Sequence, residues 1–213
     1  LWQAERWVFD PAEVSSQPLH ALMDTLRRYG VSQRHTVDAS AWRLIAESLV
    51  SPDCPEAIRR ALDGETVAAE DVLQAVAALW PNGTPMFPLL SGPKIGAMWV
   101  RILAYPGDSP ISDLGTIPVA VDTHVQRVTE MLGLVPVRAL DDGHRTRIQQ
   151  VWFEAVRLAG PYGGPGSLDG TAAGVDPALW ALGRVGCSRC EQQGKKDPVE
   201  PICALCVVRR IPQ

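Results

Sequence analysis

Residues 117–128 read IPVAVDTHVQRV, an apolar run that ends at the start of a predicted helix. The residue at this junction is Asp122, and apolar residues recur after it at helical spacing. Aspartate is favoured immediately before a helix, because its carboxylate accepts hydrogen bonds from the first backbone amides. The positive end of the helix dipole stabilises the same carboxylate. The stretch therefore predicts a helix over residues 123–132, with an ionised Asp122 at its N-terminus.

Helical spacing of apolar residues extends over nearly the whole chain, and no segment alternates convincingly as a strand would. The fold expected from this pattern is all-α, with two helical lobes. The other predicted helices span residues 19–26, 42–49 after a cap at Ser40, 56–62, 69–79, 96–103, 142–158 and 177–182.

Composition is that of a globular chain: 46% of the 213 residues are hydrophobic and 21% are charged. This length predicts one large domain or two smaller lobes. No apolar run reaches the roughly 18 residues that a membrane span needs. No leader with a basic and then an apolar segment follows Leu1, so we expect a cytoplasmic, bacterial-type, nucleoid-associated protein and not a secreted one.

Charge is unevenly distributed along the chain. The formal net charge of −4 argues against a protein that binds nucleic acid with its whole surface. Residues 38–75 contain eight acidic side chains and three arginines, whereas residues 184–213 contain six basic and three acidic side chains. The basic C-terminal segment can therefore still hold a phosphate backbone.

Four of the five cysteines form a C-x2-C-x12-C-x2-C pattern near the C-terminus. Two such pairs bring four thiolates within reach of one tetrahedral Zn²⁺ ion or one iron–sulfur cluster. A secreted module with two disulfides is the alternative, which the absence of any export signal disfavours. The expected metal ligands are Cys187, Cys190, Cys203 and Cys206.

A second segment, residues 89–100, reads LLSGPKIGAMWV. It predicts that one helix ends, a tight turn follows, and a new apolar helix begins. We expect Gly92 to supply a positive φ in the turn and Gly96 to permit close backbone approach. The free amides at the start of the new helix would favour a phosphate group.

Together, these segments resemble the endonuclease III superfamily of helix-hairpin-helix DNA glycosylases. The family hairpin reads roughly L-P-G-V-G-x-K-x-A, and a segment ending V-D-T-H-V-x-R-V carries the essential aspartate. Residues 121–128 match the second pattern almost letter for letter. The cysteines follow Leu182-Gly183-Arg184, where many members carry a [4Fe-4S] cluster. The likeness covers about residues 81–134 and 177–206.

The resemblance implies a base-excision repair enzyme that cleaves the N-glycosidic bond of a damaged or modified base in double-stranded DNA. Asp122 takes the position of the essential carboxylate, and Lys94 takes that of the lysine of members with abasic-site lyase activity. The cofactor implied is a [4Fe-4S] cluster, with Zn²⁺ as the alternative, and we expect a monomer. The residues expected to contact DNA are Gly92, Pro93, Ile95, Gly96, Arg127, Arg184 and Arg189.

The chain departs from the family pattern at several points. Leu90 stands at the first hairpin glycine, and an alignment shifted by one residue puts Ile95 at the lysine position. The shifted alignment predicts a monofunctional glycosylase that uses Asp122 and water. Residues 105–118 form a longer connection than the family has, and the family's cysteine spacing is C-x6-C-x2-C-x5-C. A non-catalytic helix-hairpin-helix DNA-binding protein and a metal-containing module that binds no nucleic acid are the competing interpretations.

For the domain organisation, we expect one lobe over residues 38–134, with the hairpin. The other lobe would pair residues 1–37 with residues 135–213, and its segment 183–213 would carry the cysteines. A cleft between the lobes would bring Lys94 and Asp122 together.

Overall fold

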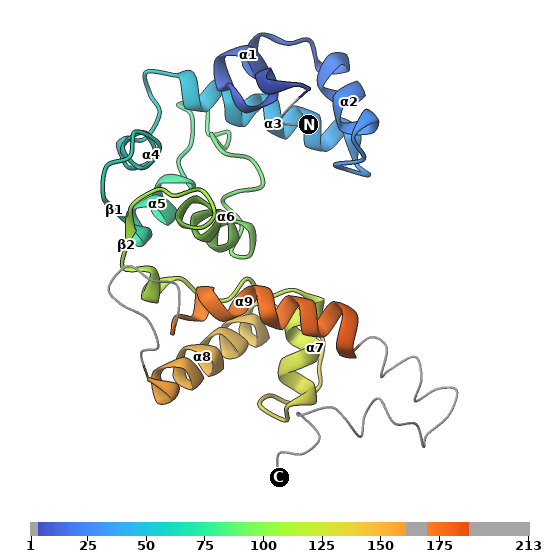
Figure 1. Ribbon diagram of the computed structural model, residues 1–213, viewed down its shortest axis with the longest axis vertical. Helices are drawn as coiled ribbons and strands as arrows, with labels where there is room; N and C mark the ends of the chain where they lie inside the picture. Colours follow the sequence, from blue (N-terminus) through green and yellow to red (C-terminus); the bar gives the residue numbers. More distant parts are fainter. Residues whose placement is uncertain (1–3, 161–169, 188–213) are drawn as a thin grey trace. The chain divides into compact units, whose positions relative to one another are not determined.

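The computed structural model describes residues 4–160 and 170–187, and in this part of the chain most residues are helical (Figure 1). The all-α prediction is therefore confirmed. The chain divides into two compact units, Leu1–Ser112 and Asp113–Gln213.

The first unit begins with a three-helix layer. A short 3-10 turn, η1 (Arg6–Phe9), leads into α1 (Pro11–Ser16), α2 (Leu19–Arg28) and α3 (His35–Val50). Helix α1 starts at Pro11 because the Asp10 carboxylate accepts a hydrogen bond from the Ala12 amide at 2.9 Å. Both α1 and α2 pack on α3, and the core between them consists of Val14, Leu22, Leu26, Ala39 and Ala46.

The rest of the first unit contains α4 (Glu56–Leu62), β1 (Val67–Ala68), α5 (Ala69–Ala75), α6 (Ile95–Ala104) and β2 (Ile111–Ser112). The two short strands pair in parallel, with Val67 opposite Ile111. They bring residues before α5 next to the connection that follows α6. The core here consists of Cys54, Ile58, Val76, Met86, Phe87 and Leu90.

The second unit contains η2 (Leu114–Thr116), α7 (Thr123–Met131), α8 (Asp142–Ala159), α9 (Ala172–Ala181) and the π-helical segment η3 (Leu182–Cys187). Helix α9 packs against both α7 and α8 (Figure 1). The core between them includes Val119, Val121, Val125, Ile148 and Leu179. The extended run before α7 is thus part of this core.

Several predicted boundaries are confirmed and others are wrong. Helix α4 spans the predicted residues, whereas Ser40 lies inside α3 and donates a hydrogen bond to the Thr36 carbonyl at 2.8 Å. Helix α9 begins five residues before Pro177, because the Thr171 hydroxyl caps it through the Gly174 amide at 3.0 Å. The strand pair was not predicted, since a two-residue strand has no readable alternation.

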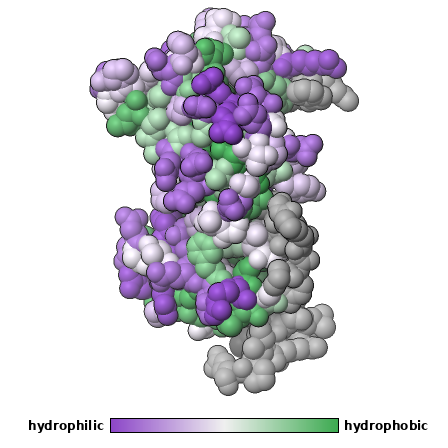
Figure 2. Space-filling view, turned by 90° about the vertical axis from the view of Figure 1, so that its left-hand side faces the viewer, coloured by the Kyte–Doolittle hydropathy of each residue, from purple (hydrophilic) through white to green (hydrophobic). Residues whose placement is uncertain are grey.

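The predicted grouping of residues 1–37 with residues 135–213 stays a prediction. Among residues 4–160 and 170–187, no helix combines the length and the apolar character needed to span a bilayer. On the face drawn in Figure 2, hydrophilic and apolar side chains are interspersed.

Candidate functional site

Asp122 is the N-cap of α7, as predicted. One of its carboxylate oxygens, Oδ1, accepts hydrogen bonds from the amides of His124 at 2.8 Å and Val125 at 3.0 Å. The backbone of Asp122 is extended, as the first residue outside a helix requires. Asp122 is half-buried, and the two amides hold its carboxylate in one direction.

The extended run before Asp122 is held from two helices. From α8, Arg145 donates to the Val121 carbonyl at 2.8 Å, and Gln149 donates to the Val119 carbonyl at 3.4 Å. From α9, the Asp176 carboxylate accepts a hydrogen bond from the Ala120 amide at 2.9 Å. Three consecutive residues of the run are therefore hydrogen-bonded to side chains that come from elsewhere in the sequence.

Segment η3 packs on the N-terminal half of α7. A Cβ placed on Gly183 would stand 2.2 Å from the carbonyl oxygen of His124, so no larger residue fits here without displacement. Arg127 reinforces this contact by donating a hydrogen bond to the Gly183 carbonyl at 3.1 Å. The segment that leads to the cysteines thus lies directly against the helix that Asp122 caps.

An aromatic and cationic group lies at the same contact. The rings of His124 and Trp180 meet edge to face, with 5.8 Å between their centroids. The guanidinium carbon of Arg184 lies 4.8 Å from the centroid of the Trp180 ring, which is the geometry of a cation–π interaction. Trp180 stays 38% exposed, so part of its indole faces solvent.

The hairpin segment takes a different form from the one expected. No helix ends directly before Gly92; α5 already ends at Ala75, and turns connect it to α6. Trp80 and Met86 donate their amides to the Thr84 and Ala78 carbonyls, which ties this connection into a local loop. Prolines at positions 81, 85 and 88 also remove amide donors that a longer helix would need.

The turn before α6 uses other residues than predicted. Leu89, and not Gly92, adopts a positive φ, of 72°. Gly96 does lie at a close backbone approach, since a Cβ there would stand 2.7 Å from the Leu90 carbonyl oxygen. Lys94 is half-buried at the N-cap position of α6, and its carbonyl accepts a hydrogen bond from the Met98 amide at 3.2 Å.

Two groupings were expected from the sequence: Lys94 with Asp122, and the four cysteines with one another. Lys94 belongs to the first unit and Asp122 to the second, so their expected convergence stays a prediction. The backbone of Cys187 ends η3, while Arg189, Cys190, Cys203 and Cys206 lie outside the described residues. Within the described ranges, no three His, Cys, Asp or Glu side chains gather as a metal site would require.

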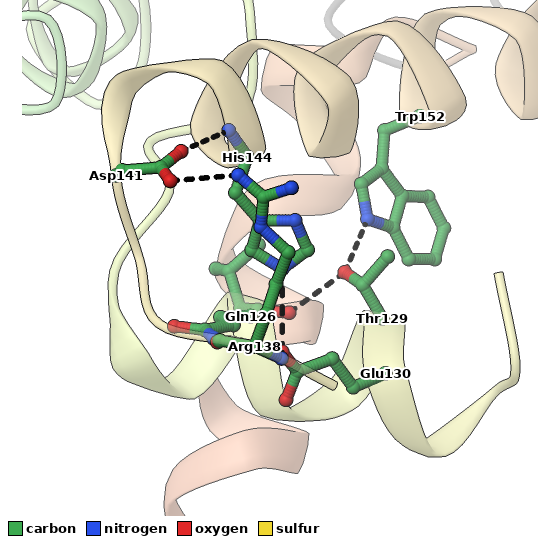
Figure 3. Close-up of polar contacts among 8 residues, drawn as sticks. Gln126, Thr129, Glu130, Arg138, Asp141, His144 and Trp152 are labelled. Atoms are coloured by element: carbon green, nitrogen blue, oxygen red, sulfur yellow. Dashed lines mark hydrogen bonds and ion pairs between the residues drawn. The ribbon is translucent and has the colours of Figure 1, made fainter. Parts of the chain in front are cut away.

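A polar cluster between α7 and α8 was not anticipated from the sequence (Figure 3). Glu130 Oε1 accepts hydrogen bonds from the Gln126 side chain at 2.7 Å and the Arg138 amide at 3.2 Å. The same oxygen lies 3.3 Å from Nε2 of His144, a side chain that is only 2% exposed. The Trp152 indole adds a hydrogen bond to the Thr129 hydroxyl at 2.9 Å.

The start of α8 is fixed by the same cluster. Asp141 Oδ1 accepts a hydrogen bond from the His144 amide at 2.7 Å, and Arg138 donates to Oδ2 at 2.7 Å. These contacts, the amide first, hold the pKa of the Asp141 carboxyl below its ordinary value. The contact between Glu130 and His144 thus holds the first turn of α8 against the C-terminal part of α7. The sequence offers one local signal of this arrangement: Asp141 stands three residues before His144, at a position typical of a helix cap.

Comparison with protein-family models, with curated proteins and with solved structures returned no match.

Proposed function

We propose that this protein is a DNA glycosylase of the helix-hairpin-helix type, which removes a damaged or modified base from double-stranded DNA. The observation that carries the proposal is the N-terminus of α7. There the Asp122 carboxylate is fixed by two amides, and η3 packs beside it with Arg127, Trp180 and Arg184.

The role proposed for Asp122 follows from the chemistry of base loss. As the N-glycosidic bond breaks, the base leaves with the bonding electrons and positive charge develops on the sugar. A carboxylate that is already oriented stabilises this charge without the cost of reorganisation. Arg145 and Gln149 donate hydrogen bonds to the preceding run, and Asp176 accepts one from it, which supports such a fixed orientation.

We further propose that Lys94 is the nucleophile of a lyase step. The lone pair of its amine forms a bond to C1′, and the departing base takes up the proton that the amine loses. The nitrogen lone pair then forms the C1′=N bond of a protonated Schiff base, while O4′ takes the electrons of the opening ring bond and a proton from water. Loss of a C2′ proton and of the 3′ phosphate by β-elimination cleaves the strand. The half-buried position of Lys94 at the start of α6 is compatible with this role.

Contacts to DNA are proposed at two places, the turn before α6 in the first unit and the pair Arg184 and Trp180 in the second unit. The amides between Gly92 and Gly96 lead into the N-terminus of α6, where the helix dipole favours a phosphate. In the second unit, the stacked Arg184 and Trp180 offer a cation and a partly exposed aromatic face, a combination that suits a nucleic acid strand. Arg127, and Arg189 beyond the described residues, are the other proposed contacts to DNA.

The four cysteines are proposed to hold a [4Fe-4S] cluster, and a Zn²⁺ ion is the alternative to the cluster. Four thiolates in two C-x2-C pairs form a donor set suited to either. The first of them, Cys187, is the last residue of η3, the segment that packs on α7. The group would stabilise the C-terminal segment, and the proposed reaction draws on no chemistry from it.

Borohydride trapping tests the proposal sharply, because the chain has only three lysines: Lys94, Lys195 and Lys196. The full chain is incubated with duplexes that each carry one lesion, and with one that carries an abasic site. We expect a covalent protein–DNA product that Lys94→Ala abolishes and that the matched control K195A/K196A retains.

Two other results would replace parts of the proposal. Base loss that appears only after alkali treatment, without trapping, would assign a monofunctional enzyme that depends on Asp122 and water. Binding of duplex DNA without trapping or base loss would favour the non-catalytic DNA-binding protein.

A further inference from the structure

Asp176 is a carboxylate in the interior of the second unit. Its residue is 6% exposed, on a helix whose neighbouring positions are mostly apolar. Its carboxylate accepts a hydrogen bond from the amide of Ala120, a residue that is 5% exposed and lies 56 positions earlier in the sequence. A polar side chain is retained in a core only where it is well hydrogen-bonded, so this contact calls for an explanation.

The position of Ala120 supplies the explanation. It stands two residues before Asp122, between the fully buried side chains of Val119 and Val121. The carbonyls on either side of it are bound from α8, by Arg145 and Gln149. Asp176 adds the hydrogen bond from α9, and so the run is held between the two helices.

We infer that Asp176 is a positioning residue for the Asp122 carboxylate. It fixes the Ala120 amide, and the run then delivers Asp122 to the amides of His124 and Val125. Without this acceptor, a buried N–H would have no replacement from water, and the run would shift to satisfy it. The catalytic half of this inference rests on the proposed function, whereas the structural half does not.

Amide hydrogen exchange of the full chain tests the structural half. We compare the wild-type protein with Asp176→Ala, which removes the acceptor, and with Asp176→Asn, which keeps an oxygen that accepts from Ala120. We expect exchange at His124 and Val125 to accelerate about tenfold or more in Asp176→Ala, since their acceptor is no longer held. Asp176→Asn should remain close to the wild type.

The matched control is Leu179→Ala, which weakens packing of the same helix without removing the hydrogen bond to Ala120. Amide exchange at His124 and Val125 should be slower in Leu179→Ala than in Asp176→Ala. If Asp176→Ala does not fold, Asp176→Ser takes its place, because a serine side chain at this position is too short to reach the Ala120 amide. Unchanged exchange at His124 and Val125 in the acceptor-lacking variant would overturn the inference.

Single-turnover base excision separates this inference from the proposed function. In an active enzyme, Asp176→Ala should lower the excision rate roughly 10- to 100-fold, while the Kd for duplex DNA stays within about twofold. Asp176→Asn should restore most of the rate, and loss of duplex binding in Asp176→Ala would contradict a positioning role. If the wild type excises no base but exchange still responds, the proposed function fails and Asp176 retains its structural role.

Discussion

Gly183 and His124 meet backbone to backbone: a Cβ on residue 183 would stand 2.2 Å from the His124 carbonyl oxygen. This contact joins the segment that leads to the cysteines to the helix that Asp122 caps. Arg127 closes it with a hydrogen bond to the Gly183 carbonyl. The helix that carries the proposed catalytic carboxylate at its N-terminus and segment η3, which ends at Cys187, are therefore in direct contact.

Substitution of Gly183 should be costly for this reason. We expect Gly183→Ala to lower the free energy of unfolding by about 2 kcal/mol, since backbone on both sides must move to admit the methyl group. The matched control is Gly115→Ala in the same unit, where nothing lies within 4 Å of the added Cβ. It should change stability by less than about 0.5 kcal/mol in urea titration. Equal effects of the two substitutions would show that the close contact is not formed.

Asp122 offers a test that separates catalysis from helix capping. Asp122→Asn keeps a side-chain oxygen for the His124 and Val125 amides, and asparagine caps helices nearly as well as aspartate. We expect stability to change by less than about 1 kcal/mol, whereas the excision rate falls about 100-fold or more because the charge is lost.

The control for that experiment is the same substitution at another cap. Asp141 caps α8 through the His144 amide, and Asp141→Asn should leave the excision rate at the wild-type level. An Asp122→Asn protein that excises bases at the wild-type rate would remove Asp122 from the mechanism.

The Asp141 carboxyl also predicts a dependence of stability on pH. Its pKa is lowered in the folded protein by the His144 amide and by Arg138, relative to the ordinary value of 3.8. The unfolded chain therefore binds a proton first as pH falls, and the stabilisation is present above that value and is lost below it. The stability difference between wild type and Asp141→Asn, followed by thermal unfolding, should be constant near neutral pH and shrink below about pH 4. A difference that grows on acidification would contradict this sign.

The cysteines predict a specific pattern of cofactor loss. The purified full chain should carry iron and sulfide and absorb visible light. Cys190→Ser should lose the iron, the sulfide and the visible absorption. Cys54→Ser is the matched control, since Cys54 is buried in the core of the first unit, where burial raises the pKa of its thiol. It should retain the cofactor. Stoichiometric zinc without iron would assign the alternative metal.

The features that local sequence determines were the ones predicted well. The cap at Asp122 depends on contacts within three residues, and the boundaries of α4 depend on Pro55 and Gly64 at its two ends. Ser40 was misread because the same residue types that cap a helix also occur inside one, where the hydroxyl bonds to the preceding turn.

The contacts that fix the candidate site were beyond prediction from one sequence. The hydrogen bonds from the Ala120 amide to Asp176 and from Arg127 to the Gly183 carbonyl each join residues 56 positions apart, and neither leaves a local pattern. The polar cluster around Glu130 and His144 likewise depends on how α7 and α8 pack. Helical periodicity identifies the faces of these helices but not which polar groups meet across them.

Whether Lys94 is a nucleophile is decided by borohydride trapping of the full chain on a duplex with an abasic site. We expect a covalent product in the wild type and in K195A/K196A, and none in Lys94→Ala. A product of undiminished yield in Lys94→Ala would contradict the assignment of Lys94, and the absence of both trapping and base loss on every duplex would contradict the proposed glycosylase.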